Sequence, residues 1–496
     1  MRCFVLAAVV VVVVVVALLP YVNCKSPNIV FVLTDDQDIK LGGLTPMKNA
    51  RRLIQDEGAT LDNFFVTTPV CCPSRATILT GLYPHNIHST DGSGCMHMNV
   101  TNPAYEAEML GNWLQKAGYM TGQYGKLLNP PGVAPYCKNT GAQKLPGFDD
   151  YLTMCNDNRY FKNTFSNNGR FFESGTNPSD YLTSIIGNYT IKFINEALKK
   201  GQPFFAYVAP HAPHVPSTPA PWYADAFSDM KAPRTPNYNF SALDHHWVIR
   251  QQQPLTAAKQ EGEIDNLFRN RWRTLLSVDD LIVAVVNLLE SKGELNNTYI
   301  ILTSDHGYQL GQFRLPMCKL QVYEHDIRVP FLIRGPGIEA GSHFKGISGN
   351  VDIAPTILEL AGANLPEFMN GKSFAKQIVK TKGADSAPGS WREMYMIEYW
   401  SLGEVVRMGH LVDGTNNTYL AARLINDTHN YVYAEFYASN TELSFGTPVE
   451  YELFDIDKDP YQLKNLYSAA TADQKLVKEF KSFIHKEYGC TGAQCS

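Results

Sequence analysis

A nucleophile, a cation and a helix N-terminus are predicted to meet within the stretch Pro69 to Gly81. The stretch reads Pro-Val-Cys-Cys-Pro-Ser-Arg-Ala-Thr-Ile-Leu-Thr-Gly. Pro73 suits the first position of a helix, where its missing N–H costs nothing, and the final glycine suits the position after the helix. Cys71 is therefore expected just ahead of a helix N-terminus, which attracts anions, and Arg75 lies about one turn further on. The alternative is a cysteine pair in a turn before a surface helix.

Carboxylates follow two predicted strands. The run Asn28 to Leu33 is continuously apolar and rich in β-forming residues, as in a buried parallel strand, and Asp35-Asp36 follows it. Carboxylates at the C-terminal end of a central strand lie where α/β sheets bind ligands, and a cation between the two would relieve their repulsion. A solvated acidic loop is the alternative. A second predicted strand, Thr298 to Leu302, leads to Asp305-His306.

Basic side chains stand at the ends of two further predicted strands. The strand Pro203 to Ala209 ends in Pro210-His211-Ala212-Pro213-His214, where prolines restrict the backbone of both histidines. Lys126 follows a strand and a glycine. On these residues alone, a structural histidine and an exposed lysine are the usual outcomes.

The stretch around Cys71 resembles the Cys-x-Pro-Ser-Arg…Thr-Gly signature of the type I, formylglycine-dependent sulfatases. In that family a formylglycine-generating enzyme oxidises the cysteine to Cα-formylglycine, whose hydrate attacks sulfate esters. The resemblance extends from Asn28 to about Leu466. It implies an α/β fold with an alkaline-phosphatase-like large domain, in which a mostly parallel central sheet lies between helices. A smaller C-terminal α+β domain with an antiparallel sheet follows.

The resemblance also implies a set of site residues. Arg75 and Lys126 would stabilise the hydrate and the sulfate, and Lys319 would face the leaving oxygen. His214, which fits the family pattern better than His211, would act as the acid. One Ca²⁺ ion is expected at Asp35, Asp36, Cys71, Asp305 and His306.

One position departs from the usual pattern of the family. Many members carry a histidine two or three residues after the lysine that Lys126 matches, whereas this chain has Leu128 and Asn129. The Gly-Lys-x-x-Asn pattern resembles the N-acetylglucosamine-6-sulfatase branch, so Asn129 is expected to contact the substrate.

The expected reaction is hydrolysis of sulfate monoesters, with the 6-O-sulfate of N-acetylglucosamine in glycosaminoglycans or related glycans as the expected substrate. A broad arylsulfatase acting on aryl sulfates is the alternative enzyme. A secreted glycan-binding pseudoenzyme is the alternative outside catalysis, and it requires Cys71 to remain a thiol. A phosphatase of the same superfamily fits less well, because those enzymes have Ser or Thr at this position.

The composition, 44% hydrophobic and 18% charged, is that of an ordinary globular protein. The net charge of −5 over 496 residues gives no reason to expect nucleic acid as a partner. Residues 1–24 are predicted to be a signal peptide, with a signal anchor as the alternative; after cleavage no membrane span is expected. A lysosomal or extracellular location follows. Six Asn-x-Ser/Thr sites predict glycosylation: Asn99, Asn188, Asn239, Asn296, Asn416 and Asn426.

The remaining predictions concern organisation. Residues 25–379 are expected to form the catalytic domain and 390–496 the C-terminal domain, joined by a polar linker at about 380–389. Cys137–Cys155 and Cys490–Cys495 are the expected disulfides, and the odd cysteine count leaves a free thiol, for which Cys318 is the candidate. Thr60 to Val66 is predicted to be one strand, and Pro46 to Glu57 one helix. Residues 130–178 are predicted to be a long irregular excursion over the active-site face.

Overall fold

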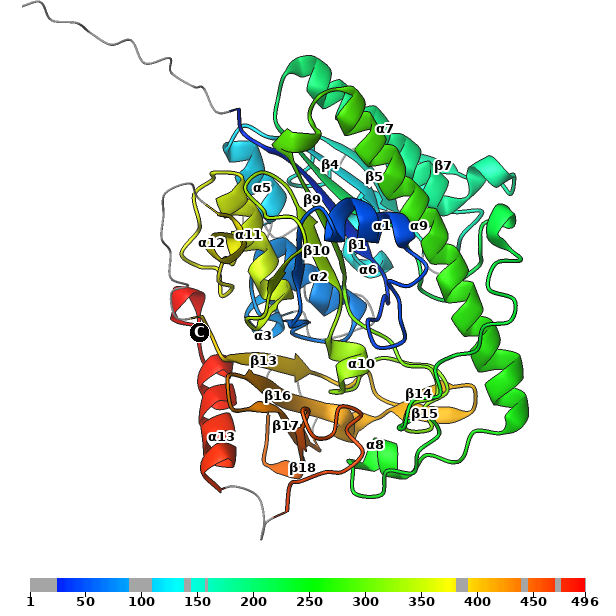
Figure 1. Cartoon of the computed structure of the whole chain (residues 1–496), viewed down its shortest axis with the longest axis vertical. Helices are drawn as coiled ribbons and strands as arrows, with labels where there is room; N and C mark the ends of the chain where they lie inside the picture. The colour runs from blue at the N-terminus through cyan, green and yellow to red at the C-terminus, as the bar shows by residue number, and fades with distance from the viewer. Residues whose placement is uncertain are drawn as a thin grey trace, which may run out of the picture.

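A ten-stranded sheet forms the centre of the molecule (Figure 1). The structure is a computed structural model that describes residues 25–88, 109–137, 144–156, 159–380, 391–438, 445–468 and 474–495. The strand order of this sheet is β11-β2-β10-β9-β1-β8-β4-β5-β6-β7. The strands are β1 (Asn28–Thr34), β2 (Ala59–Leu61), β4 (Met120–Gly125), β5 (Asp150–Met154), β6 (Thr164–Asn167), β7 (Arg170–Glu173), β8 (Phe204–Ala209), β9 (Thr298–Ser304), β10 (Phe331–Arg334) and β11 (Ser342–Phe344).

The middle of the sheet is parallel. Strands β9, β1, β8, β4 and β5 are neighbours in that order, and each pair runs parallel. On the two sides of this block, β10 and the β6–β7 hairpin are antiparallel to their neighbours. Every residue of β1, β8 and β9 is buried, as expected for strands covered on both faces. The predicted mostly parallel α/β sheet is confirmed.

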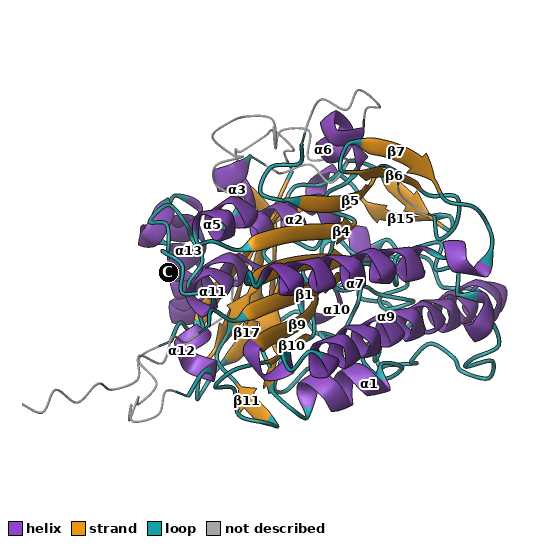
Figure 2. Cartoon of the chain, turned by 90° about the horizontal axis from the view of Figure 1, so that it is seen from above, coloured by secondary structure: helices purple, strands orange, loops and turns teal. Residues whose placement is uncertain are grey.

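Helices cover both faces of this sheet (Figures 1 and 2). Val30 and Val32 pack in one apolar cluster with residues of α7 and α9, whereas Ile29 and Phe31 pack in another with residues of α2 and α11. This division follows from the alternation of side chains along β1. The helices are α1 (Lys48–Ala50), α2 (Cys71–Thr80), α3 (Pro84–Ile87), α5 (Leu110–Lys116), α6 (Pro130–Val133), α7 (Leu182–Lys200), α8 (Trp247–Arg250), α9 (Asp265–Ser291), α10 (Glu324–Ile327), α11 (Ile353–Leu360), α12 (Ala375–Ile378) and α13 (Gln474–Tyr488).

A second, antiparallel sheet lies below the first in Figure 1, in the C-terminal part of the chain. Its order is β13 (Met394–Tyr399), β16 (Thr418–Ile425), β17 (Asn430–Tyr437) and β18 (Pro448–Asp455). Helix α13 packs on it through an apolar cluster that includes Phe480 and Tyr433. The predicted antiparallel C-terminal sheet is confirmed. A separate hairpin, β14 (Val405–Arg407) and β15 (His410–Asp413), was not predicted.

The predicted strand Thr60 to Val66 is wrong. The segment forms two short strands, β2 in the large sheet and β3 (Phe64–Phe65), which pairs with β12 (Ser348–Gly349) instead. A turn at the polar pair Asp62-Asn63 separates them. The predicted helix Pro46 to Glu57 is shorter, comprising α1 and a π-helical turn at Arg51–Gln55.

The prediction of an irregular excursion over residues 130–178 is also wrong in part. Strands β5, β6 and β7 lie within it and extend the large sheet. The two-residue turn between β6 and β7 is Asn168-Gly169, and both residues have positive φ angles of 50° and 82°. Asn-Gly is a strong hairpin signal, so the sequence did carry this information.

Three predictions concern residues outside the described ranges: the signal peptide 1–24, the glycosylation site Asn99 and most of the linker at 380–389. The two expected disulfides, Cys137–Cys155 and Cys490–Cys495, are confirmed. Cys318 has a free thiol, as predicted.

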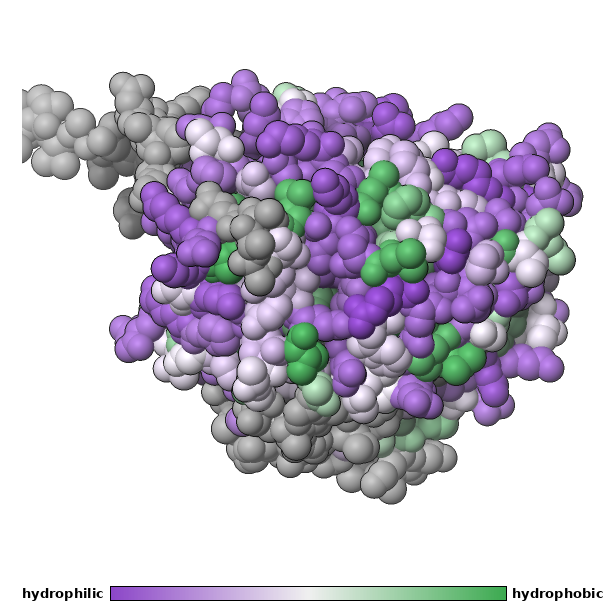
Figure 3. Space-filling model, turned by 90° about the horizontal axis from the view of Figure 1, so that it is seen from below, coloured by the Kyte–Doolittle hydropathy of each residue, from purple (hydrophilic) through white to green (hydrophobic). Residues whose placement is uncertain are grey.

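The described helices include none with the length and apolar character needed to span a bilayer. Figure 3 shows a mainly hydrophilic lower face with several separate hydrophobic patches.

Candidate active site

The carboxyl ends of β1 and β9 bring two carboxylate segments together. The strands pair in parallel with Thr34 opposite Ser304, so Asp35-Asp36 and Asp305-His306 leave the same edge of the sheet. The backbone N–H of Asp36 donates to Oδ1 of Asp305 at 3.1 Å. Asp36 has a φ of 70°, an uncommon conformation for a residue with a side chain. All four residues are buried.

Cys71 is the first residue of α2, not the residue ahead of it as predicted. Its predecessor Val70 is extended, and the N–H of Ser74 makes an early helical bond to the Val70 carbonyl. Pro73 is thus the third helical residue, which is permitted because the first four N–H groups of a helix have no intrahelical partner. Gly81 ends the helix with a φ of 70°, as predicted.

Ser74 and Arg75 attach this helix to the end of β9. The Ser74 hydroxyl donates to the Asp305 carbonyl and accepts from Asn350 Nδ2 at 2.9 Å. Arg75 Nε donates to Asp305 Oδ2 at 2.8 Å, and its Nη1 donates to the Lys126 carbonyl at 2.8 Å. Burial lowers the pKa of Arg75, but Asp305 and Asp35 outweigh burial and raise the pKa above its ordinary value.

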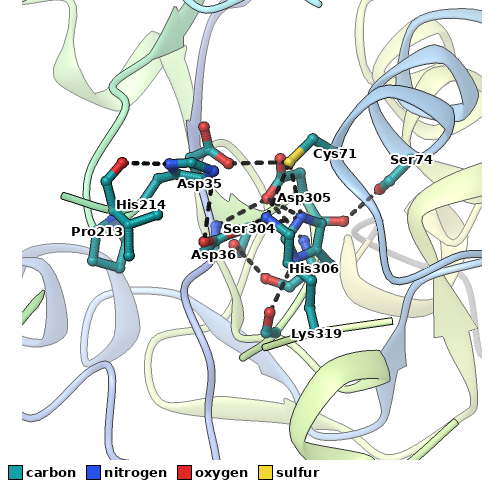
Figure 4. Close-up of polar contacts among 12 residues, drawn as sticks. Asp35, Asp36, Cys71, Ser74, Pro213, His214, Ser304, Asp305, His306 and Lys319 are labelled. Carbon is teal, nitrogen blue, oxygen red and sulfur yellow. Dashed lines mark hydrogen bonds and ion pairs between the residues drawn. The ribbon is translucent and has the colours of Figure 1, made fainter. Parts of the chain in front are cut away.

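Two lysines from separate loops pair with the carboxylates of the site, and Figure 4 shows Lys319 among them. Lys126 Nζ lies 2.8 Å from Asp35 Oδ2. Lys319 Nζ lies 2.6 Å from Asp36 Oδ1 and 3.3 Å from Cys71 Sγ. Burial raises the pKa of the Cys71 thiol, but Lys126 and Lys319 outweigh burial and hold it well below its ordinary value. The field at position 71 therefore favours a negative charge.

The two proline-flanked histidines occupy different positions. His214 lines the cavity, and its Nε2 lies 3.9 Å from Asp36 Oδ2. His211 is fully buried behind it, with Nδ1 3.0 Å from Asp35 Oδ2. Burial lowers the pKa of His214, but Asp36 and Asp35 outweigh burial and raise the pKa. His211 supports a carboxylate of the site, a role that the sequence analysis missed; the signal was its place three residues before His214.

His306 has the orientation of a metal ligand. Its Nδ1 bonds the carbonyl of Gly307 at 2.9 Å, so Nδ1 carries the proton and the Nε2 lone pair faces the site. Nε2 lies 3.4 Å from Asp36 Oδ1 and 3.6 Å from Asp305 Oδ1. Asp305 outweighs the effect of burial and raises the pKa of His306 to about 9, so a cation bound here would replace the proton on Nε2.

The donor set fits a divalent cation. Two overlapping groups each offer ligand atoms within 4.8 Å of one another. Oδ2 of Asp36 is buried without a hydrogen-bond partner, a costly arrangement that a cation would remove. Carboxylate oxygens suit Ca²⁺, and the imidazole is the less usual ligand. The groups are Asp35, Asp36, Cys71 and His214, and Asp35, Cys71, Asp305 and His306.

A cavity of about 730 Å³ opens onto these residues. Cys71, Lys126, Asn129, His214 and Lys319 all line it. The structure thus brings every predicted site residue of this cluster to one place, from six separate segments of the chain. The unpredicted β14–β15 hairpin and the residues before it also line the cavity, with Leu402, Val405 and Arg407. The turn residue Gly409 was the only sequence signal for that hairpin.

The predicted glycosylation sites within the described ranges differ in exposure. Asn188 and Asn296 are exposed, and Asn416 and Asn426 are half-buried. Asn239 is half-buried as well, and both ends of its side-chain amide bond the backbone of Leu255, at 2.9 and 3.4 Å. Asn188 and Asn296 are therefore the more accessible acceptors.

Known proteins similar to this chain agree on one family. The family model "Sulfatase" matches residues 27–363, and the model "N-sulphoglucosamine sulphohydrolase, C-terminal" matches residues 316–488. N-acetylglucosamine-6-sulfatase of Capra hircus is 37% identical over 495 residues, which cover 95% of this chain and 85% of the relative. The enzyme of the same name from Homo sapiens is 37% identical over 95% of this chain and 86% of its own length.

A more distant relative and a solved structure complete the comparison. An arylsulfatase of Volvox carteri is 30% identical over 95% of this chain and 76% of its own length. One solved structure, a complex with "its substrate D-Glucosamine-2-N, 6-O-disulfate", has a TM-score of 0.74 and 25% identity. The similarity covers 93% of this chain and 97% of that one.

Proposed function

The chain belongs to the sulfatase family and hydrolyses sulfate esters, and from this premise we propose that its substrate is the 6-O-sulfate of N-acetylglucosamine in glycosaminoglycans or related glycans. Two relatives that match nearly the whole chain are named N-acetylglucosamine-6-sulfatase. The similar solved structure holds a glucosamine that carries a 6-O-sulfate. A broad arylsulfatase is the second candidate, supported by the 30% identity to the Volvox enzyme.

The position of Cys71 carries the chemical part of the proposal. It opens the helix α2, lies 3.3 Å from Lys319 Nζ, and lines the cavity. We propose that Cys71 is converted to formylglycine by a formylglycine-generating enzyme. Its hydrate supplies one hydroxyl to attack sulfur and a second to release the sulfate. The positive field of Lys126 and Lys319 at this position favours the ionised hydroxyl, as it favours the thiolate.

Asp35, Asp36, Asp305 and His306, together with residue 71, are proposed to hold one Ca²⁺ ion. The ion would polarise the sulfate and lower the pKa of the hydrate. Charge balance supports a divalent ion: the three carboxylates are matched by Arg75, Lys126 and Lys319. One divalent ion then balances one singly charged sulfate ester and one ionised hydroxyl.

Each remaining polar residue has a proposed task. Arg75 fixes Asp305 and the Lys126 backbone, and its buried Nη2 lies 3.7 Å from Asp35 Oδ2, so its charge stabilises the anions of the site. Lys126 and Lys319 neutralise charge at the sulfate and the leaving oxygen. His214 Nδ1 bonds the Val215 carbonyl at 2.7 Å, so Nδ1 keeps its proton and Nε2 is the atom that transfers one to the leaving oxygen.

The cavity walls support a charged sugar as substrate. Leu402 and Val405 offer apolar surface to a sugar ring, and Asn129 lines the same cavity with a polar amide. Arg407 stands at the exposed rim and forms no ion pair with another residue that the structure describes. A guanidinium binds carboxylates and sulfates with two parallel hydrogen bonds, so Arg407 suits a second anionic group of a glycan.

A secretory location, lysosomal or extracellular, is part of the proposal. Two disulfides support it, because disulfides persist mainly in oxidising compartments. The test of the substrate is the ratio of kcat/KM for 6-sulfated N-acetylglucosamine to that for 4-nitrophenyl sulfate. A ratio well above one supports the proposal. A higher value for the aryl sulfate would move the broad arylsulfatase to first place.

A further inference from the structure

The backbone around Lys319 is held from two different parts of the fold. On one side, Cys318 pairs with Gln309 through two backbone hydrogen bonds of 2.8 and 3.2 Å. On the other side, the Leu320 carbonyl accepts hydrogen bonds from Asn417 Nδ2 at 3.3 Å and from the Tyr419 hydroxyl at 3.4 Å. Gln309 follows the end of β9, whereas Tyr419 lies in the C-terminal strand β16 and Asn417 directly precedes that strand. The lysine therefore sits where the two sheets meet.

Leu320 has a backbone conformation that needs such support. Its φ is 88°, in the region that side-chain-bearing residues rarely adopt. A strained conformation of this kind persists only where the surroundings hold it. Leu320 is 3% exposed, and Asn417 and Tyr419 are fully buried, so water does not replace their hydrogen bonds.

Gln321, the residue after Leu320, also contacts the C-terminal part of the chain. Gln321 Nε2 donates to the carbonyl of Val412 in β15 at 2.9 Å, and its backbone N–H donates to Asp326 Oδ2 at 2.9 Å. Its Oε1 lies 3.2 Å from His246 Nε2. The path of the chain after Lys319 is thus fixed mainly by contacts to other segments.

We propose that Asn417 and Tyr419 are positioning residues for Lys319. By holding the Leu320 carbonyl they keep the backbone of Lys319 in place, so that its long side chain delivers the ammonium to Asp36 and to residue 71. This inference rests on the proposed function, in which Lys319 faces the leaving oxygen. It gives the C-terminal sheet a part in the chemistry of a site built otherwise from the large sheet.

The double variant Asn417→Ala with Tyr419→Phe tests the inference. It removes both hydrogen bonds to Leu320 and leaves the Asn416-x-Thr glycosylation site intact. Misplacing a catalytic group by about 1 Å can cost up to roughly 100-fold, so kcat on 6-sulfated N-acetylglucosamine should fall by about 10- to 100-fold with KM nearly unchanged. On 4-nitrophenyl sulfate the loss should be smaller, because a phenolate leaves readily without a cation beside it and only the part of the loss that acts through the ionised hydroxyl of residue 71 is shared by both substrates.

Two comparisons separate positioning from general damage. Tyr433→Phe removes a buried hydroxyl from the same sheet, one that bonds Glu435 at 2.8 Å, and should leave both rates within about twofold. In a Lys319→Ala background, the double variant should have no further effect on kcat, because residues that act as one unit are not additive. If the double variant does not fold, the single variant Tyr419→Phe is measured on the same two substrates and in the same Lys319→Ala background.

The outcomes are distinct. Selective loss on the sugar sulfate that vanishes in the Lys319→Ala background supports the inference. Equal loss on both substrates, or a full additional loss in that background, overturns it. If Lys319→Ala leaves kcat on the sugar sulfate unchanged, the proposed role of Lys319 is wrong. The inference about Asn417 and Tyr419 is then wrong as well.

Discussion

Replacing His214 by alanine tests the proposed acid. His214 lines the cavity beside Cys71, and its Nε2 is the ring atom that remains once Nδ1 has bonded Val215. A general acid contributes on the order of 10²–10⁴ in rate, which is about 3 to 5 kcal/mol of transition-state stabilisation. His214→Ala should therefore lower kcat on the sugar sulfate by that factor. The loss on 4-nitrophenyl sulfate should be much smaller, because its phenolate needs little protonation.

The pH dependence gives a second measurement. Asp36 and Asp35 raise the pKa of His214 above its ordinary value of 6.5 despite burial. The protonated imidazole of His214 is therefore present at pH values below this raised pKa. It loses its proton as the pH rises through the pKa. The kcat of the wild type should therefore fall as the pH rises, and this alkaline limb should disappear in His214→Ala.

The control for this prediction is His343→Ala. His343 lies in the edge strand β11, is half-exposed, pairs with Asp62 and is not among the residues that line the cavity. It should leave kcat and the pH profile unchanged. A loss of less than about threefold in His214→Ala, in protein with a wild-type unfolding temperature, would refute the assignment of His214 as the acid.

Three further predictions concern the rim, the metal and the contact between the sheets. Arg407→Ala should raise the KM for a polyanionic glycan about tenfold and leave the KM for 4-nitrophenyl sulfate unchanged. If the variant and the wild type have equal KM values for the glycan, Arg407 does not bind it. Chelation should abolish turnover and Ca²⁺ restore it, and an ion at 100 times its Kd should stabilise the fold by about 2.7 kcal/mol in thermal unfolding. Arg423 outweighs burial and lowers the pKa of Glu324 to about 2. Arg423→Met should thus cost about 3–5 kcal/mol in urea unfolding at pH 7, a difference that shrinks as the pH falls from about 4.5 toward 2.

The sequence predicts the central strands and the place of the charged residues well. Asn28–Thr34 and Thr298–Ser304 are long apolar runs, and such runs have few alternatives to a buried parallel strand. Acidic residues directly after them must then lie at the carboxyl edge of the sheet. The family signature around Cys71 adds the remaining members of the cluster, because it fixes residue types that local chemistry alone leaves open.

Short elements held by tertiary contacts are harder to predict. The segment after Ala59 divides between two sheets because Ile333 and Ser348, far along the chain, supply the partners of its two halves. Strands β14 and β15 have only three and four residues, too few to show the alternation of apolar and polar residues that predicts a strand. The Leu320 carbonyl is bonded by Asn417 and Tyr419, about a hundred residues away, and its φ of 88° has no local signal.

Whether Cys71 becomes formylglycine is the central question of this account. Peptide mass spectrometry of residues 53–75, after reduction and trypsin, answers it on protein made in a secretory host with the modifying enzyme. The account predicts an aldehyde in place of the Cys71 thiol. An intact thiol, in a host that converts a control sulfatase, would contradict the proposed mechanism and favour a glycan-binding pseudoenzyme.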